Sequence, residues 1–342
     1  MFSFTRKRVI FTIACLIFLA AVSLIIGSGI FFIRPHMEAD KEQIIIVKGG
    51  MSLKQVAGEL ERKEIISNRT IFRLCAKILG YGRNIKAGEY RLSSRMSPVT
   101  ILEKLTKGEM ITYPVTIPEG FTKEKIADLL DKKKLVNRRE FLSLTDNSDL
   151  LKPYNISSPS LEGYLYPDTY QFVRGTPASV AVETMVKRFL QVTEEVRKEA
   201  EKMGMEKVII LASIVEKETA NPAERPIIAS VFLNRLKRRM RLDSDPTVIY
   251  GIKDFNGNLT RKDLARATPY NTYIIRGLPP GPIANPGFKS IEAVLHPART
   301  DYLYFVSKNN GSHYFSRTLS EHNRAVRIYQ KRKRRGSKKS NI

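Results

Sequence analysis

The stretch VIILASIVEKET, Val208 to Thr219, reads as an apolar helix that ends in two carboxylates. At about 100° per residue, Glu216 and Glu218 lie about 200° apart around this helix, so they cannot both face one pocket. The residues three, four and seven positions before Glu218 are large and apolar: Val215, Ile214 and Leu211. Glu218 therefore falls on the stripe that faces the core, whereas Glu216 shares a side with smaller, more polar residues. This makes Glu218 the better candidate for a desolvated carboxyl with a raised pKa, as a general acid at neutral pH requires. These residues alone also fit an ordinary charged helix end.

The surrounding chain predicts a mainly helical domain over residues 156–330. We expect helices at Ala178 to Lys202, Lys207 to Thr219 and Ala223 to Arg238. Between and after them lie loops dense in Pro, Gly, Asn and Tyr, including DSDPTVIYG (243–251) and TPYNTYIIRGLPPGPIANPG (268–287). Long ordered loops are often functional, and Tyr, Asn, Asp and Arg are usual in a carbohydrate or amide binding groove.

Two short related modules are predicted before this domain, at residues 44–110 and 111–155. A shift of 70 residues aligns the two segments, each of which reads as a strand, a Gly turn and an amphipathic helix. Ser52 and Thr122 fall at corresponding helix N-caps, where a hydroxyl can satisfy open backbone N–H groups. The segment AGEYRL, Ala87 to Leu92, looks like a strand that pairs with the first. The expected fold class is α+β throughout.

An uncharged run, VIFTIACLIFLAAVSLIIGSGIFFI, occupies residues 9–33. As a helix it would be about 37 Å long, against a hydrocarbon core of about 30 Å, so it predicts a single transmembrane helix. The alternative, a cleaved secretory signal, would have an apolar region of about 7 to 15 residues. Basic residues dominate segment 1–8, whereas acidic residues occur in the linker, 34–43. The positive-inside rule therefore places the N-terminus in the cytoplasm and the bulk of the chain outside it.

The formal net charge of +24 suits nucleic acid, an anionic membrane surface or an acidic polymer. An extracytoplasmic position makes nucleic acid the poorest of these partners. The basic tail, residues 331–342, reads as a solvated, disordered end of the chain. Of the two cysteines, Cys15 lies in the apolar run and Cys75 outside it, so the exported part cannot close an internal disulfide.

Six strings resemble the endolytic murein lytic transglycosylases of the MltG, or YceG-like, type. They are EGYLYPDTY (162–170), ASIVEKET (212–219), ASVFLNRL (229–236), LDSDPTVIYG (242–251), YNTYIIRGLPPGPIANPG (270–287) and HPARTDYLYFV (296–306). The resemblance covers nearly the whole chain apart from the tail after Gln330. It implies that the front module is a LysM-type glycan-binding unit.

The resemblance implies cleavage of peptidoglycan strands between N-acetylmuramic acid (MurNAc) and N-acetylglucosamine (GlcNAc), at internal bonds, on the outer face of the cytoplasmic membrane. The catalytic glutamate of the family maps onto Glu218, and we assign Tyr270, Asn271 and Asp245 to substrate binding. Glu218 would protonate the leaving oxygen and then accept a proton from the sugar's own C6 hydroxyl, giving a 1,6-anhydro end. No metal or cofactor is expected, because His296, His313 and His322 lack ligand spacing. Cell-wall synthases are candidate partners.

Two other functions stay open at this point. A muramidase would use water with Asp243 or Asp245 as the second carboxylate, although both also read as turn and capping residues around Pro246. A non-enzymatic glycan-binding scaffold would need neither carboxylate.

Overall fold

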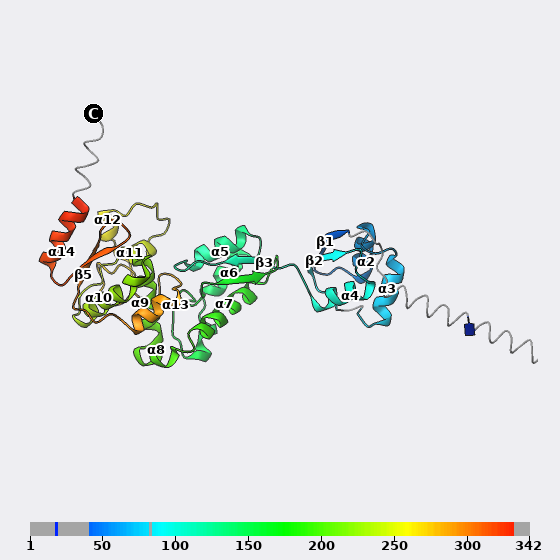
Figure 1. The fold of residues 1–342 in the computed structure, drawn as a ribbon, viewed down its shortest axis with the longest axis horizontal. Helices are drawn as coiled ribbons and strands as arrows, with labels where there is room; N and C mark the ends of the chain where they lie inside the picture. The colour runs from blue at the N-terminus through cyan, green and yellow to red at the C-terminus, as the bar shows by residue number, and fades with distance from the viewer. Residues whose placement is uncertain (1–17, 20–40, 82–83, 332–342) are drawn as a thin grey trace, which may run out of the picture. The chain divides into compact units, whose positions relative to one another are not determined.

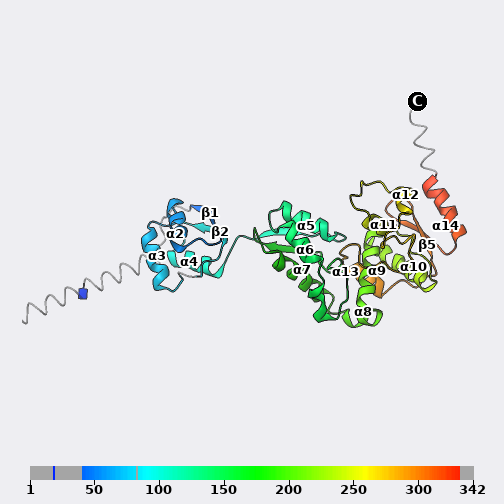
Figure 2. The ribbon, with the colours of Figure 1, turned by 180° about the vertical axis from the view of Figure 1, so that it is seen from behind.

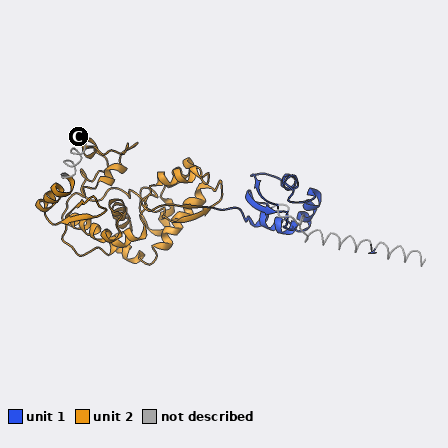
Figure 3. Cartoon of the chain, turned by 45° about the horizontal axis from the view of Figure 1, so that its top comes forward, with its two compact units in different colours: residues 1–113 blue, residues 114–342 orange. Residues whose placement is uncertain are grey.

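The computed structural model describes residues 18–19, 41–81 and 84–331, and the chain divides into two compact units, 1–113 and 114–342 (Figures 1, 2 and 3). The fold is a mixture of helices and short antiparallel sheets, which confirms the α+β class. The predicted transmembrane helix at 9–33 lies outside the described residues, except for Phe18 and Leu19, and so does the tail after Lys331. None of the helices in the described ranges is long and apolar enough to cross a membrane.

The first unit is a two-stranded sheet packed against helices. Its elements are β1 (Glu42–Val47), α2 (Leu53–Arg62), α3 (Arg69–Ile78), β2 (Gly88–Ser93) and α4 (Pro98–Lys107). β1 and β2 pair antiparallel from Glu42↔Ser93 to Val47↔Gly88, which confirms the predicted strand at 87–92 and its partner. A core of buried apolar side chains from all five elements, with Tyr90 and Phe72 among the largest, holds the unit together.

The second unit contains the remaining elements. In chain order these are β3 (Tyr113–Thr116), α5 (Lys123–Lys132), α6 (Arg138–Thr145), η1 (Asp149–Tyr154), β4 (Thr169–Phe172), α7 (Ala178–Val192), α8 (Arg197–Met203), α9 (Met205–Glu218), η2 (Pro222–Glu224), α10 (Arg225–Lys237), α11 (Asp245–Tyr250), α12 (Arg261–Leu264), α13 (Phe288–Leu295), β5 (Tyr304–Ser307), β6 (His313–Ser316), α14 (Leu319–Val326) and η3 (Arg327–Lys331).

The sequence repeat is also a repeat of backbone conformation. Ser52 and Thr122 both cap their helices, each accepting a hydrogen bond from a backbone N–H in the first turn. After each of these helices, one residue adopts a left-handed conformation, Glu64 in the first copy and Lys134 in the second, both at φ 57°. Each copy continues into a second helix, α3 or α6.

The second copy extends further along the chain than expected, because the strand that completes its sheet follows residue 155. β3 pairs with β4, which lies beyond residue 155, so a module that ended there would leave β3 without its partner strand. The division expected near residues 150–160 falls inside the second unit. Asn285 fastens this copy to the rest of the unit, because its side chain bonds to Gly163 N, Leu165 N and Phe121 O, each at 2.9 Å.

α9 is the central helix of the second unit. Every residue from Val208 to Val215 is buried, and α9 packs against α8, α10, α11 and α13, which surround it in Figure 1. The predicted helices at 207–219 and 223–238 correspond to α9 and α10. The single helix expected over 178–202 is instead two helices, α7 and α8, separated by a turn that starts at Thr193. The Thr193 hydroxyl donates to Phe189 O at 2.8 Å at the end of α7.

Candidate active site

The charged residues at the end of α9 have different surroundings. Glu216 has a side chain that is 6% exposed and forms an ion pair with Arg225 at 3.1 Å. It also accepts hydrogen bonds from Gly287 N at 3.1 Å and Ser290 Oγ at 2.7 Å. Glu216 is therefore buried more completely than its polar helix face suggests, and it ties α9 to α10 and α13.

Glu218, the last residue of α9, lines a pocket of about 360 Å³. Ser244 Oγ donates to Glu218 Oε1 at 2.5 Å. Burial raises the pKa of Glu218 to about 7, and the nearby charge of Asp245 adds to this effect; the Ser244 hydrogen bond and Arg235 act against it. Near neutral pH this carboxyl is therefore present in both its protonated and its ionised forms.

The pocket is lined by both polar and aromatic side chains. Besides Glu218, its lining residues come from α10, the loop before α11, the first residue of α11, the loop after α12, β5 and α14: Arg235, Leu242, Asp243, Asp245, Tyr273, Tyr304, Phe305, Leu319 and His322. Aromatic faces beside charged and hydroxyl groups are suited to holding a sugar.

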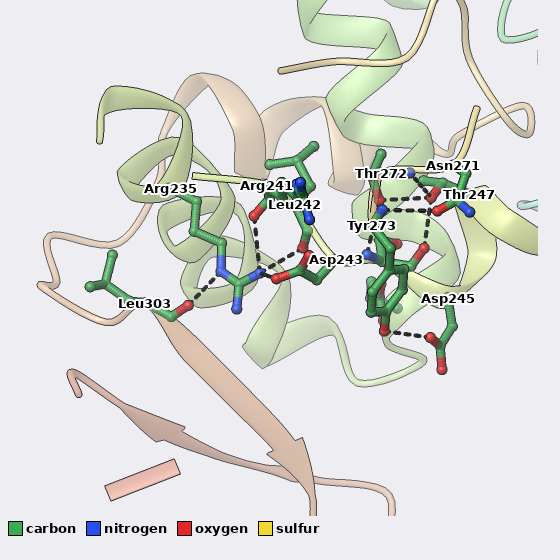
Figure 4. Close-up of polar contacts among 12 residues, drawn as sticks. Arg235, Arg241, Leu242, Asp243, Asp245, Thr247, Asn271, Thr272, Tyr273 and Leu303 are labelled. Carbon is green, nitrogen blue, oxygen red and sulfur yellow. Dashed lines mark hydrogen bonds and ion pairs between the residues drawn. The ribbon is translucent and has the colours of Figure 1, made fainter. Parts of the chain in front are cut away.

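Buried hydroxyls fix the loop that carries Ser244 (Figure 4). Ser244 N donates to Thr272 Oγ1 at 3.0 Å, and Thr272 Oγ1 lies 2.8 Å from Thr247 Oγ1. The hydroxyl of Tyr273 donates to Asp245 Oδ1 at 2.7 Å, as Figure 4 shows. The two loops quoted from the sequence, 243–251 and 268–287, thus hold each other in place at the pocket.

Arg235 anchors the other end of the same loop (Figure 4). Its guanidinium donates to Leu303 O at 2.6 Å, to Leu242 O at 2.8 Å and to Asp243 Oδ2 at 3.0 Å. Asp243 adopts a left-handed backbone conformation, φ 49°. These bonds give Asp243 a structural partner and set a fixed positive charge near Glu218.

The structure separates the residues predicted to bind substrate. Asp245 lines the pocket with Glu218. Tyr270 lies instead in a second cavity, packed against Tyr250 with ring centres 4.8 Å apart. Asn271 is fully buried, and its amide donates to Leu264 O and Arg266 O at 3.0 and 2.8 Å. In this structure Asn271 holds its own loop, because its amide donates to these carbonyls and its Oδ1 accepts from Tyr273 N at 2.9 Å.

Sequence reasoning did not predict several residues that line the pocket or bond to Glu218. Ser244, a buried residue between Asp243 and Asp245, donates to Glu218. Tyr273 lines the pocket and lies in a loop rich in tyrosine. His322 lacks the spacing of a metal ligand in the sequence, yet it lines the pocket, where its ring stacks on that of Tyr304 with centres 5.3 Å apart. Burial and the charge of Arg235 lower the pKa of His322. No spacing signal in the sequence predicts these contacts.

A second, larger cavity has a volume of about 1,070 Å³. Lys217 and Pro246 line this cavity, and their chain neighbours Glu218 and Asp245 line the first. The other residues of its wall come mostly from the start of α5 and from segment 249–255: Thr122, Lys123, Glu124, Lys125, Asp146, Pro159, Ser160, Ile249, Tyr250, Gly251, Ile252, Lys253, Asp254, Phe255, Tyr270 and Ile283.

Glu162 is a second buried carboxyl, behind the tyrosines of this cavity. It is 1% exposed and accepts hydrogen bonds from Asn285 Nδ2 at 2.8 Å, from Tyr250 OH at 3.2 Å and from Lys123 N at 3.2 Å. Burial, with a contribution from the charge of Glu124, raises its pKa to about 8. Its oxygens are taken up by protein donors, which is the arrangement of a structural group.

Comparisons with known proteins identify the family of this chain. Residues 45–328 match the YceG-like family. The endolytic murein transglycosylase of Bacillus subtilis is 35% identical over 332 residues, covering 90% of this chain and 91% of the relative. A protein of the same name from Streptococcus pneumoniae serotype 2 is 28% identical, and the match covers 92% of this chain but 64% of the relative. The crystal structure of a yceG-like protein from Listeria monocytogenes is similar over 84% of this chain and 100% of that one, with 37% identity and a TM-score of 0.57. The chain therefore belongs to the YceG-like family.

Proposed function

We propose that this protein is an endolytic murein transglycosylase, a lyase that cleaves MurNAc–GlcNAc bonds within peptidoglycan strands and leaves 1,6-anhydro-MurNAc ends. The observation that carries the proposal is Glu218, a carboxyl that can keep its proton near neutral pH at the wall of a pocket. Relatives of this chain named endolytic murein transglycosylase support the substrate and the reaction.

In the proposed reaction one carboxyl does the work of both acid and base. Protonated Glu218 gives its proton to the glycosidic oxygen as the bond from C1 of MurNAc to that oxygen breaks, and positive charge develops on the sugar ring. The C6 hydroxyl of the same MurNAc then bonds to C1 and returns its proton to Glu218. No water is consumed, and the enzyme ends in the protonation state in which it began.

The surroundings of Glu218 suit both halves of this cycle. Burial favours the protonated acid at the start, whereas the Ser244 hydroxyl and the charge of Arg235 stabilise the carboxylate formed in the middle. The pKa of about 7 reflects this balance, and a group with a pKa near the working pH is efficient as both acid and base.

A muramidase is the second candidate, and one observation favours it. Asp245 lines the same pocket, and its charge raises the pKa of Glu218. A hydrolase would need such a second carboxylate to activate water. The bond from Tyr273 to Asp245 gives that carboxylate an alternative task, which is to hold the tyrosine ring at the pocket wall.

Product analysis on purified peptidoglycan tests these readings. Mass spectrometry of strands treated with wild-type protein should find 1,6-anhydro ends, and the Glu218→Gln variant should yield none. The exposed Glu195 offers a matched control, since Glu195→Gln makes the same change away from the pocket. Reducing ends without the anhydro bridge would favour the muramidase, and cleavage by Glu218→Gln equal to wild type would remove Glu218 from the mechanism.

We also propose that residues 9–33 anchor the protein in the cytoplasmic membrane by a single helix, with the catalytic part outside the cytoplasm. The uncharged run and the basic segment before it support this placement. Protease added to spheroplasts should then digest the bulk of the chain, and full protection would contradict the proposed orientation.

We propose, as part of the same function, that the first unit is a LysM-like glycan-binding module. The segment from β3 to β4 would be a second, related copy. The strand–helix–helix–strand order of the first unit supports this, together with Ile44 and Ile46, which are half-exposed on β1 and could contact a sugar face. Contact with cell-wall synthases stays a prediction.

A further inference from the structure

Two lysines at the second cavity, Lys125 and Lys217, form no ion pair within the described ranges. Lys217, from the end of α9, donates to Gly120 O at 3.3 Å, and Lys125 Nζ lies 5.9 Å from the centre of the Phe121 ring. Burial and then repulsion from Lys125 lower the pKa of Lys217, and the charge of Glu216 acts against this effect. Two ammonium groups on the wall of one cavity favour an anionic ligand, because an anion would offset their repulsion.

The charge of this cavity is unevenly distributed. Lys123 is already neutralised by an ion pair with Asp146. The carboxylate of Glu124 raises the pKa of both Glu162 and Tyr270, so it acts at the tyrosine end of the cavity. Lys253 and Asp254, which are neighbours in the chain, contribute one charge of each sign to the wall. The excess positive charge of the lining therefore comes from Lys125 and Lys217, with Glu216 offsetting part of it at Lys217.

The rest of the wall is largely apolar. Proline, isoleucine and aromatic side chains line it: Pro159, Pro246, Ile249, Phe255 and Ile283, with Tyr250 and Tyr270. The volume of about 1,070 Å³ is enough for a short peptide segment. An acidic peptide fits such a wall better than a bare anion, since its aliphatic parts would be buried as well.

The position of the cavity says where such a peptide would be attached. Lys217 and Glu218 are consecutive, so their Cα atoms are about 3.8 Å apart. Pro246 and Asp245 are a second pair of neighbours that line the two cavities. We therefore expect a group attached to the sugar at Glu218 to lie within reach of the second cavity. In a peptidoglycan strand, MurNAc carries a peptide with free carboxylates on its lactyl group.

We propose that the second cavity binds the carboxylate-bearing stem peptide of the MurNAc held at Glu218, with Lys125 and Lys217 contacting its carboxylates. The inference rests on the proposed function. It makes the stem peptide a determinant of which bonds along a strand are cut.

Binding to a non-cleaving protein tests this inference separately from the chemistry. The full-length Glu218→Gln variant, kept in mild detergent, is titrated with two preparations of uncrosslinked strands. One preparation keeps the stem carboxylates free, and in the other these carboxylates are converted to neutral amides with carbodiimide and ammonia. The two ligands have nearly the same size and differ in charge.

We expect Glu218→Gln to bind the carboxylate strands roughly tenfold more tightly than the amidated ones. Adding Lys125→Gln and Lys217→Gln should bring this ratio close to one. Lys132→Gln removes the same charge from an exposed position on the same helix, α5, and should leave the ratio unchanged.

Three outcomes would overturn the inference. They are a ratio near one in the parent protein, a ratio that the two lysine changes do not alter, and an equal loss of affinity for both strands, which would assign the cavity to the sugars. Product analysis with wild-type protein is an independent readout. Absence of anhydro ends there would reject the proposed function while the binding ratio still decides the role of the lysines.

Discussion

The surroundings of Glu162 and Glu218 differ sharply, although burial raises the pKa of both carboxyls, to about 8 and about 7. Glu162 is 1% exposed and surrounded by donors from Lys123, Tyr250 and Asn285. Glu218 keeps partial exposure through its pocket, and its one hydrogen bond among the described residues comes from Ser244. A raised pKa therefore indicates burial, whereas access to a pocket separates a group that can reach substrate from one that supports the fold.

The strongest test of this comparison makes the same change at both sites. Glu218→Gln should lower the rate of strand cleavage by roughly 10²- to 10⁴-fold, because the proton donor is lost. Glu162→Gln should keep most of the activity, because a neutral amide resembles the protonated carboxyl. Rates of release of anhydro-ended products measure both. Equal losses in the two variants would mean that Glu162 also takes part in the reaction.

The second test concerns stability. Glu162→Ala should lower the free energy of unfolding by about 3 kcal/mol, because the buried donors of Asn285 and Tyr250 lose their acceptor. Glu162→Gln should cost clearly less, because it keeps one oxygen for these donors. Urea unfolding followed by circular dichroism provides the measurement. A loss in Glu162→Ala no greater than in Glu195→Gln would show that Glu162 does not hold the fold.

The pH dependence of stability gives a third test. The folded protein keeps the Glu162 proton up to about pH 8, whereas the unfolded chain loses it near the ordinary value of 4.5. The stabilising effect of this proton is complete below about pH 4.5 and is lost as the pH rises towards 8. Relative to Glu162→Gln, wild-type stability should therefore fall by up to about 1.4 kcal/mol per pH unit in this window. Parallel curves for the two proteins would contradict the raised pKa.

The smallest expected effect is a shift of the pH–rate profile. Activity should decline above about pH 7 as Glu218 loses the proton it must donate. Ser244→Ala should move this decline to higher pH by about one unit or less, because the lost hydrogen bond favoured the carboxylate. Asp245→Asn should move it to lower pH, since a repelling charge is removed. Shifts in the same direction for both variants would show that another group controls the profile.

Much of the local structure could be predicted from the sequence. Helix periodicity located α9 and α10, capping hydroxyls located the starts of α2 and α5, and the pairing of β1 with β2 followed from two nearby strand patterns. Periodicity also placed Glu218 and Glu216 on different sides of α9, although it did not predict that Glu216 is buried as well. These features depend on residues within a few turns of each other, where spacing alone fixes which side chains share a face.

The rest depends on contacts between distant segments, which spacing does not reveal. The partner of β3 is β4, beyond an insertion that holds η1 and Glu162. Glu216 is neutralised by Arg225, and Asn271 is turned inward by backbone carbonyls of its own loop. Ser244 reaches Glu218, and Tyr273 reaches the pocket, because buried threonines hold their two loops together. Residue type suggested a groove, but only the packing shows which polar groups face it.

The hydrogen bonds of Asn285, which connect the second copy to the rest of the unit, have a practical consequence for anyone who wishes to produce the catalytic part alone. A fragment starting at residue 156 would lack β3 and α5, so the Asn285 amide and the Glu162 carboxyl would lose partners at Phe121 and Lys123. Such a fragment is expected to express poorly or aggregate. A fragment that starts just before Tyr113 keeps every one of these bonds, and it is the natural shortened form for crystallisation.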